Sequence, residues 1–413
     1  MIDFAALVAA NRAGQSIGQP SYCTAHPQTL TAILTAYRDS ADPILIEATC
    51  NQVNQDGGYT GMTPANFRRF VEDLAHRAGV DPARITLGGD HLGPNPWKSR
   101  PAAEAMDKAK TMVADYVRAG FTKIHLDASM ACADDGTLSE ATMAARAAEL
   151  CAVAEANASG PLHYIIGTEV PVPGGETETL SALAVTKPDA ARATVDLHRA
   201  AFAKAGLNAA FDRVIGVVVQ PGVDFGNDQV FRFDLPAASV LSKSILDLPN
   251  IVFEAHSTDY QPSDALAGLV ANHFAILKVG PELTFAYRQA IIALAALETA
   301  LDLPKPSNFV QTITDEMHRD PKHWRAYVAP DDRESRMLLY GLSDRVRYYW
   351  PNPAIQSALQ RLTENLAAVR HEPGLVAQYG FNLVDTDDTT DLPTRFMQQA
   401  VGAVVTKYRS ACG

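Results

Sequence analysis

Eight short apolar segments recur along roughly the first 280 residues, and nearly all of them end in a charged or hydrogen-bonding residue. Apolar runs of this length are typical of strands that are buried on both faces of a sheet. The segments span 18–23, 44–47, 85–90, 123–127, 164–169, 214–220, 251–254 and 275–278. Their starts lie about 25 to 50 residues apart, and the amphipathic stretches between them predict helices. We therefore predict an α/β protein, a parallel (β/α)8 TIM barrel, with a doubly wound open sheet as the alternative.

Two of the predicted helices have clear boundary residues. Thr63 and Pro64 are an N-cap followed by proline at the first helical position, and Gly79 ends that helix. A second helix is predicted from about residue 102 to residue 119, where Gly120 follows.

The chain after the eighth apolar segment is mainly helical in character. Residues 285–301 are rich in alanine and leucine, and little strand pattern follows up to Gly413. We expect residues 1–300 to form the barrel that carries the active site, and residues 301–413 to form a mainly helical C-terminal extension packed on it.

The charge of the chain excludes several classes of partner. Among its 413 residues 35 are Lys or Arg and 47 are Asp or Glu, so the net charge is −12, and no basic cluster stands out. A chain of this sign is repelled by nucleic acid and by anionic membranes. No apolar run approaches the roughly 20 residues that span a bilayer. The acidic start Met1-Ile2-Asp3 is unlike a secretory signal, and the five cysteines include no CxxC pair. We expect a cytoplasmic protein with a small-molecule partner.

Charged and hydrogen-bonding residues follow the predicted strands at equivalent positions. They are His26, Glu47, Asp90, His91, His125, Asp127, Glu169, Gln220, Glu254, His256 and Lys278. In a barrel the carboxyl ends of the strands meet at one rim, where catalytic groups are found. Any one of these residues could be a paired structural residue or a helix cap. The whole set at one rim favours a binding site, because burying many ionisable groups together is costly.

Two further segments each have two interpretations. The polar, glycine-rich loop 51–61 is either a lid that hydrogen-bonds sugar hydroxyls or a solvated surface loop. The segment 343–350 concentrates arginine and aromatic residues, and it is either a packed surface helix or the source of an arginine, Arg345, for a substrate phosphate. Glycine-rich nucleotide-binding motifs are missing from the sequence, so a kinase is unsupported.

Eight motifs resemble those of the GatZ/KbaZ family. They are EATCNQVNQ at 47–55, GGYTGMTP at 57–64, GGDHLGPN at 88–95, HLDASM at 125–130, GTEVPVPGGE at 167–176, EAHSTDY at 254–260, LKVGP at 277–281 and LSDR at 342–345. The resemblance extends over nearly the whole chain. It implies one of two functions. Stand-alone members are regarded as D-tagatose 6-phosphate 4-epimerases, whereas members were first described as the non-catalytic subunit of class II D-tagatose-1,6-bisphosphate aldolase.

The same stretches are also similar to the barrel of class II aldolases, and this resemblance implies a divalent metal. Asp90 and His91 resemble the aldolase pair in which the histidine binds the metal and the aspartate transfers protons. The expected metal ligands are His91, His256 and Glu169, with Gln220 as a fourth. Gln220 stands where the aldolase pattern has a histidine, and an amide oxygen binds soft metals more weakly than imidazole does. The metal is therefore expected to be Zn, Mn, Co or Mg.

The remaining expected site residues come from the strand ends, from the loop 51–61 and from the segment 343–350. The expected catalytic residues are Asp90 as the first choice for acid/base work, Asp127 or Glu47 as the second, and Lys278 as a hydrogen-bond donor to the C2 oxygen. The expected substrate-binding residues are Asn51, Gln52, Asn54, Ser257, Asp259 and Arg345. We expect these groups to converge on one pocket at the carboxyl end of the barrel.

The chemistry of epimerisation at C4 restricts the mechanism. The C4 hydrogen of a 2-ketose phosphate is not α to the C2 carbonyl, so simple proton removal cannot invert C4. We therefore expect a 4-epimerase, a sugar-phosphate isomerase of galactitol or tagatose catabolism. It would interconvert D-tagatose 6-phosphate and D-fructose 6-phosphate by metal-assisted retro-aldol and aldol steps. The alternative is an accessory subunit that stabilises a separate class II D-tagatose-1,6-bisphosphate aldolase. The expected partners are a ketose phosphate and either a second copy of the chain or an aldolase subunit.

Overall fold

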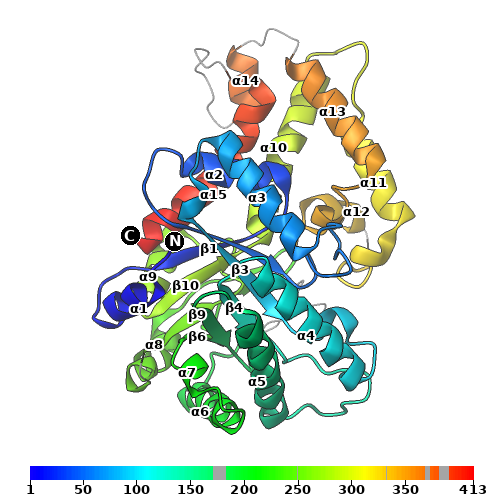
Figure 1. Cartoon of the computed structure of the whole chain (residues 1–413). Helices are drawn as coiled ribbons and strands as arrows, with labels where there is room; N and C mark the ends of the chain where they lie inside the picture. Colours follow the sequence, from blue (N-terminus) through cyan, green and yellow to red (C-terminus); the bar gives the residue numbers. More distant parts are fainter. Residues whose placement is uncertain (171–182, 249, 332, 368–372, 381–389) are drawn as a thin grey trace.

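Eight parallel strands close into a barrel with the neighbour order β1-β10-β9-β6-β5-β4-β3-β2 (Figure 1). The structure is a computed structural model that describes residues 1–170, 183–248, 250–331, 333–367, 373–380 and 390–413. The strands of the barrel are β1 (Gln19–Cys23), β2 (Ile44–Thr49), β3 (Ile85–Leu92), β4 (Lys123–Leu126), β5 (His163–Ile166), β6 (Val214–Val219), β9 (Val252–Ala255) and β10 (Phe274–Val279). The predicted (β/α)8 TIM barrel is confirmed, and each predicted apolar segment forms one of its strands.

Helices surround the barrel and cover its outer face (Figure 1). They are α2 (Pro27–Ala36), α3 (Pro64–Ala78), α4 (Ala102–Arg118), α5 (Glu140–Asn157), α6 (Pro188–Lys204), α7 (Asn208–Phe211), α8 (Leu235–Ser244) and α9 (Ser263–Ala271). The first helix, α1 (Phe4–Arg12), differs from these, because its Phe4 and Val8 pack with the apolar residues of the barrel interior. In α3 the apolar residues Phe67, Val71 and Leu74 recur at helical spacing and are buried. The Thr63 side chain caps the N-terminus of α3, and Gly79, with φ 73°, ends it. Both predicted boundaries are confirmed.

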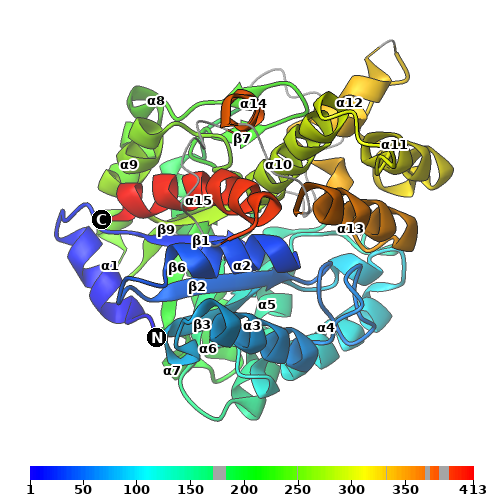
Figure 2. The ribbon, with the colours of Figure 1, turned by 90° about the horizontal axis from the view of Figure 1, so that it is seen from above.

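The chain beyond the eighth strand is helical and returns to the barrel at its end. Its helices are α10 (Pro281–Ala300), α11 (Phe309–Arg319), α12 (Glu334–Tyr340), α13 (Pro353–Ala367), α14 (Pro373–Tyr379) and α15 (Leu392–Cys412). The last of these, α15, packs against α2, α9 and α10 (Figure 2). The Gly18 N–H donates to Cys412 O at 2.9 Å, so the last helix contacts the start of β1. The division of the chain into two domains near residue 300 stays a prediction.

Two short segments lie at the open end of the barrel. Strands β7 (Asp224–Phe225) and β8 (Val230–Phe231) form a small antiparallel pair that follows β6. The 3₁₀ segment η5 (Arg345–Tyr348) is held against α10 by a buried ion pair, in which Arg288 Nε donates to Asp344 Oδ1 at 2.9 Å. Thr284 of α10 donates to Asp344 Oδ2 at 2.5 Å. The extension is therefore attached to the barrel through α10.

No helix in the described part of the chain combines the length and the apolar character that a membrane crossing requires.

The barrel interior contains a network of buried charges. Lys123 Nζ lies 2.7 Å from Glu47 Oε1 and 2.7 Å from Glu254 Oε2, and all three side chains are fully buried. Lys278 Nζ lies 2.6 Å from Glu47 Oε2 and 2.8 Å from Asp90 Oδ2. A Cβ atom at Gly88 would lie 2.7 Å from Glu47 Cγ, so glycine at this position leaves the space that Glu47 fills. Because buried charges are costly unless they are paired, the strands must place these groups opposite one another.

The Lys123→Met variant is expected to lower the free energy of unfolding by roughly 3–5 kcal/mol, because it leaves the Glu254 carboxylate buried without its ammonium partner. The double variant Lys123→Met/Glu254→Gln is expected to lose less, because it also removes the unpaired charge. Urea denaturation followed by circular dichroism measures both losses. Equal losses in the two variants, or none in the single variant, would contradict a paired network.

His198 on α6 makes the stability depend on pH. Its Nδ1–H donates to Thr194 O at 2.8 Å, and burial lowers its pKa from 6.5 to about 4. The unfolded chain takes up this proton as the pH falls below about 6.5, whereas the folded chain resists until about pH 4. The contribution is therefore fully present above about pH 6.5, and on the order of 3 kcal/mol is lost as the pH falls toward 4.

The His198→Leu variant should reduce the loss of stability between pH 7 and pH 5, as measured by urea denaturation at both pH values. His318→Leu is the matched control, because the side chain of His318 is 42 % exposed on α11. His318→Leu should keep the pH dependence of the parent chain. The interpretation fails if His198→Leu keeps it as well.

Candidate functional site

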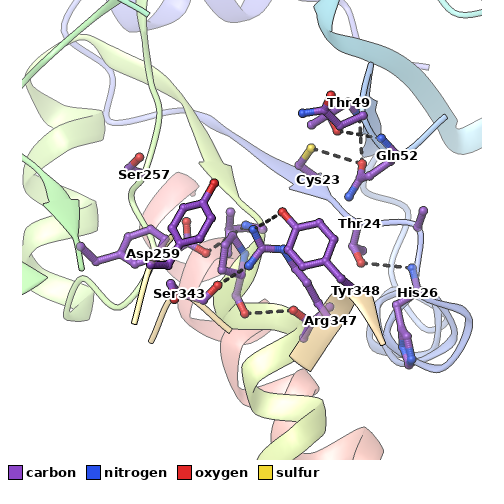
Figure 3. Close-up of a pocket in the computed structure, with 18 of the residues that line it drawn as sticks. Cys23, Thr24, His26, Thr49, Gln52, Ser257, Asp259, Ser343, Arg347 and Tyr348 are labelled. Atoms are coloured by element: carbon purple, nitrogen blue, oxygen red, sulfur yellow. Dashed lines mark hydrogen bonds between the residues drawn. The ribbon is translucent and has the colours of Figure 1, made fainter. Parts of the chain in front are cut away.

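A cavity of about 560 Å³ opens at the carboxyl ends of the barrel strands. Asp90, His91, His256 and Lys278 line it from the barrel, as predicted for the strand ends. The loop after β2, the β7–β8 pair and the segment 343–350 of the extension line it as well. Figure 3 shows Cys23, Thr49 and Gln52 on the barrel side and Arg347 and Tyr348 on the extension side.

Three histidine rings lie together beside two buried carboxylates. The ring centroids of His91, His125 and His256 are between 5.0 Å and 5.3 Å from one another. His125 Nδ1 lies 3.0 Å from Asp90 Oδ1, and His256 Nε2 lies 2.9 Å from Glu254 Oε1. His91 has a φ of 51°, an uncommon backbone conformation for a residue other than glycine, and such residues cluster at functional sites.

Four of these groups fit a divalent metal ion. Asp90, His125, Glu254 and His256 each offer one ligand atom, and these atoms lie within 4.8 Å of one another. His125 Nε2 is buried without a hydrogen-bond partner among the described residues, an arrangement that is costly unless the nitrogen binds something. Burial lowers the pKa of His256 to about 4, so its ring is neutral at pH 7, the form that binds metals. Nitrogen and oxygen ligands of this kind suit zinc and other first-row divalent ions.

The structure brings only part of the predicted ligand set into this group. His256 belongs to it, and His91 lies beside it, with Nδ1 held 2.7 Å from Asp127 Oδ2. Glu169 accepts a hydrogen bond from the Thr186 hydroxyl, and Gln220 Oε1 accepts from the N–H groups of residues 222 and 223. Neither Glu169 nor Gln220 belongs to the four-residue group or lines the cavity. Their roles as ligands stay predictions, and the GGE motif at 174–176 lies outside the described residues.

Asp90 and Asp127, two of the predicted acid/base groups, have lowered pKa values, and the pKa of Lys278 is raised. Burial raises the pKa of Asp90, but the charges of His91 and Lys278 outweigh it and hold the pKa well below its usual range. Burial opposes a similar lowering at Asp127, which is caused by its hydrogen bond with His91. Burial lowers the pKa of Lys278, but the Asp90 and Glu47 carboxylates raise it well above its usual value. Because proton transfer is most efficient when the pKa is near the working pH, these groups are better suited to binding than to acid/base work.

The predicted substrate-binding residues separate into two sets. Asn51, Gln52, Ser257 and Asp259 line the cavity. Asn54 does not line it, because its side chain holds the loop 51–61 together. It donates to the Cys50 carbonyl at 2.8 Å and accepts from the N–H groups of residues 56 and 58.

Arg345, the predicted phosphate ligand, lies outside the cavity lining. Its guanidinium lies 3.6 Å from the ring centre of Tyr327 and 4.7 Å from that of Tyr348, and its Nε donates to His323 O at 2.7 Å. Arg347, two residues later on η5, lines the cavity and donates to Tyr348 Oη at 2.9 Å. The role of Arg345 in phosphate binding stays a prediction, and Arg347 is the arginine of this turn that faces the cavity.

Sequence reasoning did not single out Lys123, and it placed His125 and Glu254 among the polar groups of the rim without naming either as a catalytic residue or a metal ligand. Lys123 and His125 belong to β4, and Glu254 belongs to β9. Their spacing carries a signal, because alternate residues of a strand share one face. Lys123 and His125 alternate with apolar residues before Asp127, and Glu254 precedes His256 by two positions. All five side chains therefore point to the barrel interior.

Comparison with known proteins identifies relatives of the whole chain. Residues 4–413 match the sequence model of the family described as D-tagatose-1,6-bisphosphate aldolase subunit GatZ/KbaZ-like. The chain is 46 % identical over 416 residues to the D-tagatose-1,6-bisphosphate aldolase subunit GatZ of Klebsiella pneumoniae, with 98 % of each chain covered. It is 45 % identical over 416 residues to the subunit of the same name from Salmonella newport, with 98 % of each covered.

A solved structure has the same fold over nearly the full length. The crystal structure of a probable tagatose 6-phosphate kinase from Sinorhizobium meliloti 1021 superposes with a TM-score of 0.88 at 46 % identity. The match covers 96 % of this chain and 100 % of that chain.

These relatives correct two expectations. The sequence led us to expect a D-tagatose 6-phosphate 4-epimerase, and therefore an isomerase, but the similar proteins from Klebsiella and Salmonella are named as aldolase subunits. The expectation was wrong because the presence of ionisable groups at the strand ends does not by itself indicate catalysis. Here those groups are paired with one another inside the barrel. From the family match and the identity over the full length, the chain belongs to the GatZ/KbaZ-like family.

Proposed function

We propose that this chain is the accessory subunit of a class II D-tagatose-1,6-bisphosphate aldolase and that it stabilises a separate catalytic subunit. The observation that carries this proposal is the 46 % identity, over 98 % of both chains, to a protein named as a subunit of that aldolase. Coverage of both chains means that no large segment of the relative is missing from this chain.

The charge pattern of the site supports an accessory role. Glu47 and Glu254 are fully buried on either side of Lys123, and Glu47 also contacts Lys278. Groups that are paired in this way fix the arrangement of the barrel interior, because each buried charge needs its partner.

The same rim binds a divalent ion and a ketose phosphate in this proposal. His125 and His256 supply imidazole nitrogens, and Asp90 and Glu254 supply carboxylate oxygens. Zinc, manganese or cobalt suits this ligand set better than magnesium, which prefers oxygen ligands. A bound divalent ion would polarise the carbonyl and hydroxyl oxygens of a ketose. Asn51, Gln52 and Ser257 from the cavity lining would hydrogen-bond the sugar hydroxyls.

Adding the purified chain to the catalytic subunit of a class II D-tagatose-1,6-bisphosphate aldolase should extend the lifetime of its activity several-fold, because binding to the native state opposes its unfolding. Cleavage of tagatose 1,6-bisphosphate is followed at a temperature at which the catalytic subunit alone loses activity. The chain alone should produce no cleavage. An unrelated (β/α)8 barrel protein at the same concentration is the control. Cleavage by the chain alone, or no more protection than the unrelated barrel provides, would overturn the accessory role.

Equilibrium dialysis against zinc or manganese, followed by elemental analysis, should find about one ion per chain. His125→Ala and His256→Ala should each weaken metal binding by about tenfold or more, because each removes one imidazole ligand. His318→Ala is the control, because that imidazole lies on α11, outside the cavity lining. Circular dichroism establishes that the variants are folded. Unchanged metal binding by both site variants would show that these histidines are not ligands.

A further inference from the structure

The N-terminus of α10 opens into the cavity, and a carboxylate already occupies it. The chain leaves β10 at Val279 and enters α10 at Pro281, and Gly280 and Pro281 line the cavity. Asp259, from the loop after β9, accepts through Oδ1 from the N–H of Gly280 at 3.0 Å and from the N–H of Glu282 at 2.8 Å. These backbone groups belong to the loop and helix N-terminus that follow the last strand of the barrel. In (β/α)8 barrels this place frequently binds the phosphate of a ligand.

Contacts with α10 and α15 hold the loop that carries Asp259. The N–H of Tyr260 donates to Glu282 Oε2 at 2.7 Å, which ties the loop after β9 to the first turn of α10. Lys407 of α15 forms an ion pair with Glu282. Tyr408, also on α15, donates to the Thr258 carbonyl at 2.7 Å. The loop is therefore attached to two helices on either side of Asp259, and the backbone of Asp259 cannot move away from α10 without breaking these contacts.

The surroundings of Asp259 already carry negative charge. Its side chain is 2 % exposed, and the Glu282 carboxylate lies on the next element. Burial, followed by the charge of Glu282, raises the pKa of Asp259 to about 7. A phosphate that approached this place would find the N–H groups of Gly280 and Glu282 already bonded to Asp259 Oδ1, in a space with little solvent to replace those bonds.

We propose that Asp259 determines ligand specificity by occupying, with its carboxyl group, the phosphate position at the N-terminus of α10. The part of a bound ligand that faces β9 and β10 is then an uncharged, hydroxyl-bearing end, because a hydroxyl can bond to a carboxyl group, whereas a phosphate needs the two N–H donors that Asp259 already occupies. A ligand phosphate must lie elsewhere in the cavity, on the side lined by Arg347. This inference rests on the ligand site proposed above and does not depend on the aldolase partner.

Removing the carboxylate should create a new phosphate site in the full-length chain. In Asp259→Ser the N–H groups of Gly280 and Glu282 lose their acceptor and become available to an anion. Binding of radiolabelled inorganic phosphate, measured by equilibrium dialysis, should strengthen by about tenfold or more relative to the parent chain. Asp259→Asn removes the charge but keeps an oxygen on the two N–H groups, so it should strengthen phosphate binding by a smaller factor.

Asp224→Ser is the matched control, because Asp224 is also a buried carboxylate of the cavity lining but its Oδ1 accepts from Phe225 on β7. It should leave phosphate binding unchanged. If Asp259→Ser does not fold, a gain in Asp259→Asn alone supports the proposal. Phosphate binding no stronger than that of the parent chain in the folded Asp259 variants, or an equal gain in Asp224→Ser, overturns it. The assay contains no aldolase, so failure of the accessory role would leave its result unchanged.

Discussion

The ion pairs inside the barrel are the interaction on which the rest of the structure depends. Glu47 of β2, Gly88 of β3 and Lys123 of β4 lie in one row across three neighbouring strands. Gly88 has no side chain, so Glu47 and Lys123 meet across it at 2.7 Å. Lys123 then reaches Glu254 of β9 on the other side of the barrel. Because a fully buried charge is tolerated only with a partner, a shift in the register of β2, β3 or β4 would separate these charges, so the row helps to fix that register.

The same pairing decides what the open end of the barrel can do. Lys278 forms ion pairs with Glu47 and with Asp90, and Asp127 lies within hydrogen-bond distance of His91 Nδ1. What remains is a set of imidazole and carboxylate atoms that fits a metal ion, with His125 Nε2 as a buried nitrogen without a partner among the described residues. The site is therefore equipped to bind. The names of the relatives, which are aldolase subunits, agree with the accessory role proposed above.

The helical extension completes the cavity instead of forming a separate lobe beside it. The buried Arg288–Asp344 ion pair holds η5 on α10, which places Arg347 at the cavity. The last helix, α15, packs beside α2 and α9 and contacts the loop that carries Asp259 through Lys407 and Tyr408. Residues more than 100 positions apart in the sequence thus shape one end of the ligand site.

The sequence by itself determined the barrel, its strands and several helix boundaries, because these depend on local periodicity and on caps such as Thr63 and Gly79. It also indicated which strand ends carry polar groups, and Asp90, His91, His256 and Lys278 do line the cavity. Only the tertiary structure decided which groups meet. Glu169 and Gln220 form hydrogen bonds within the loops that follow their strands. The side chains of Lys123, His125 and Glu254, in contrast, make their contacts inside the barrel. The guanidinium of Arg345 stacks on the ring of Tyr327. The physical reason is that a polar side chain pairs with the nearest available partner in space, and that partner comes from a strand or helix distant in the sequence.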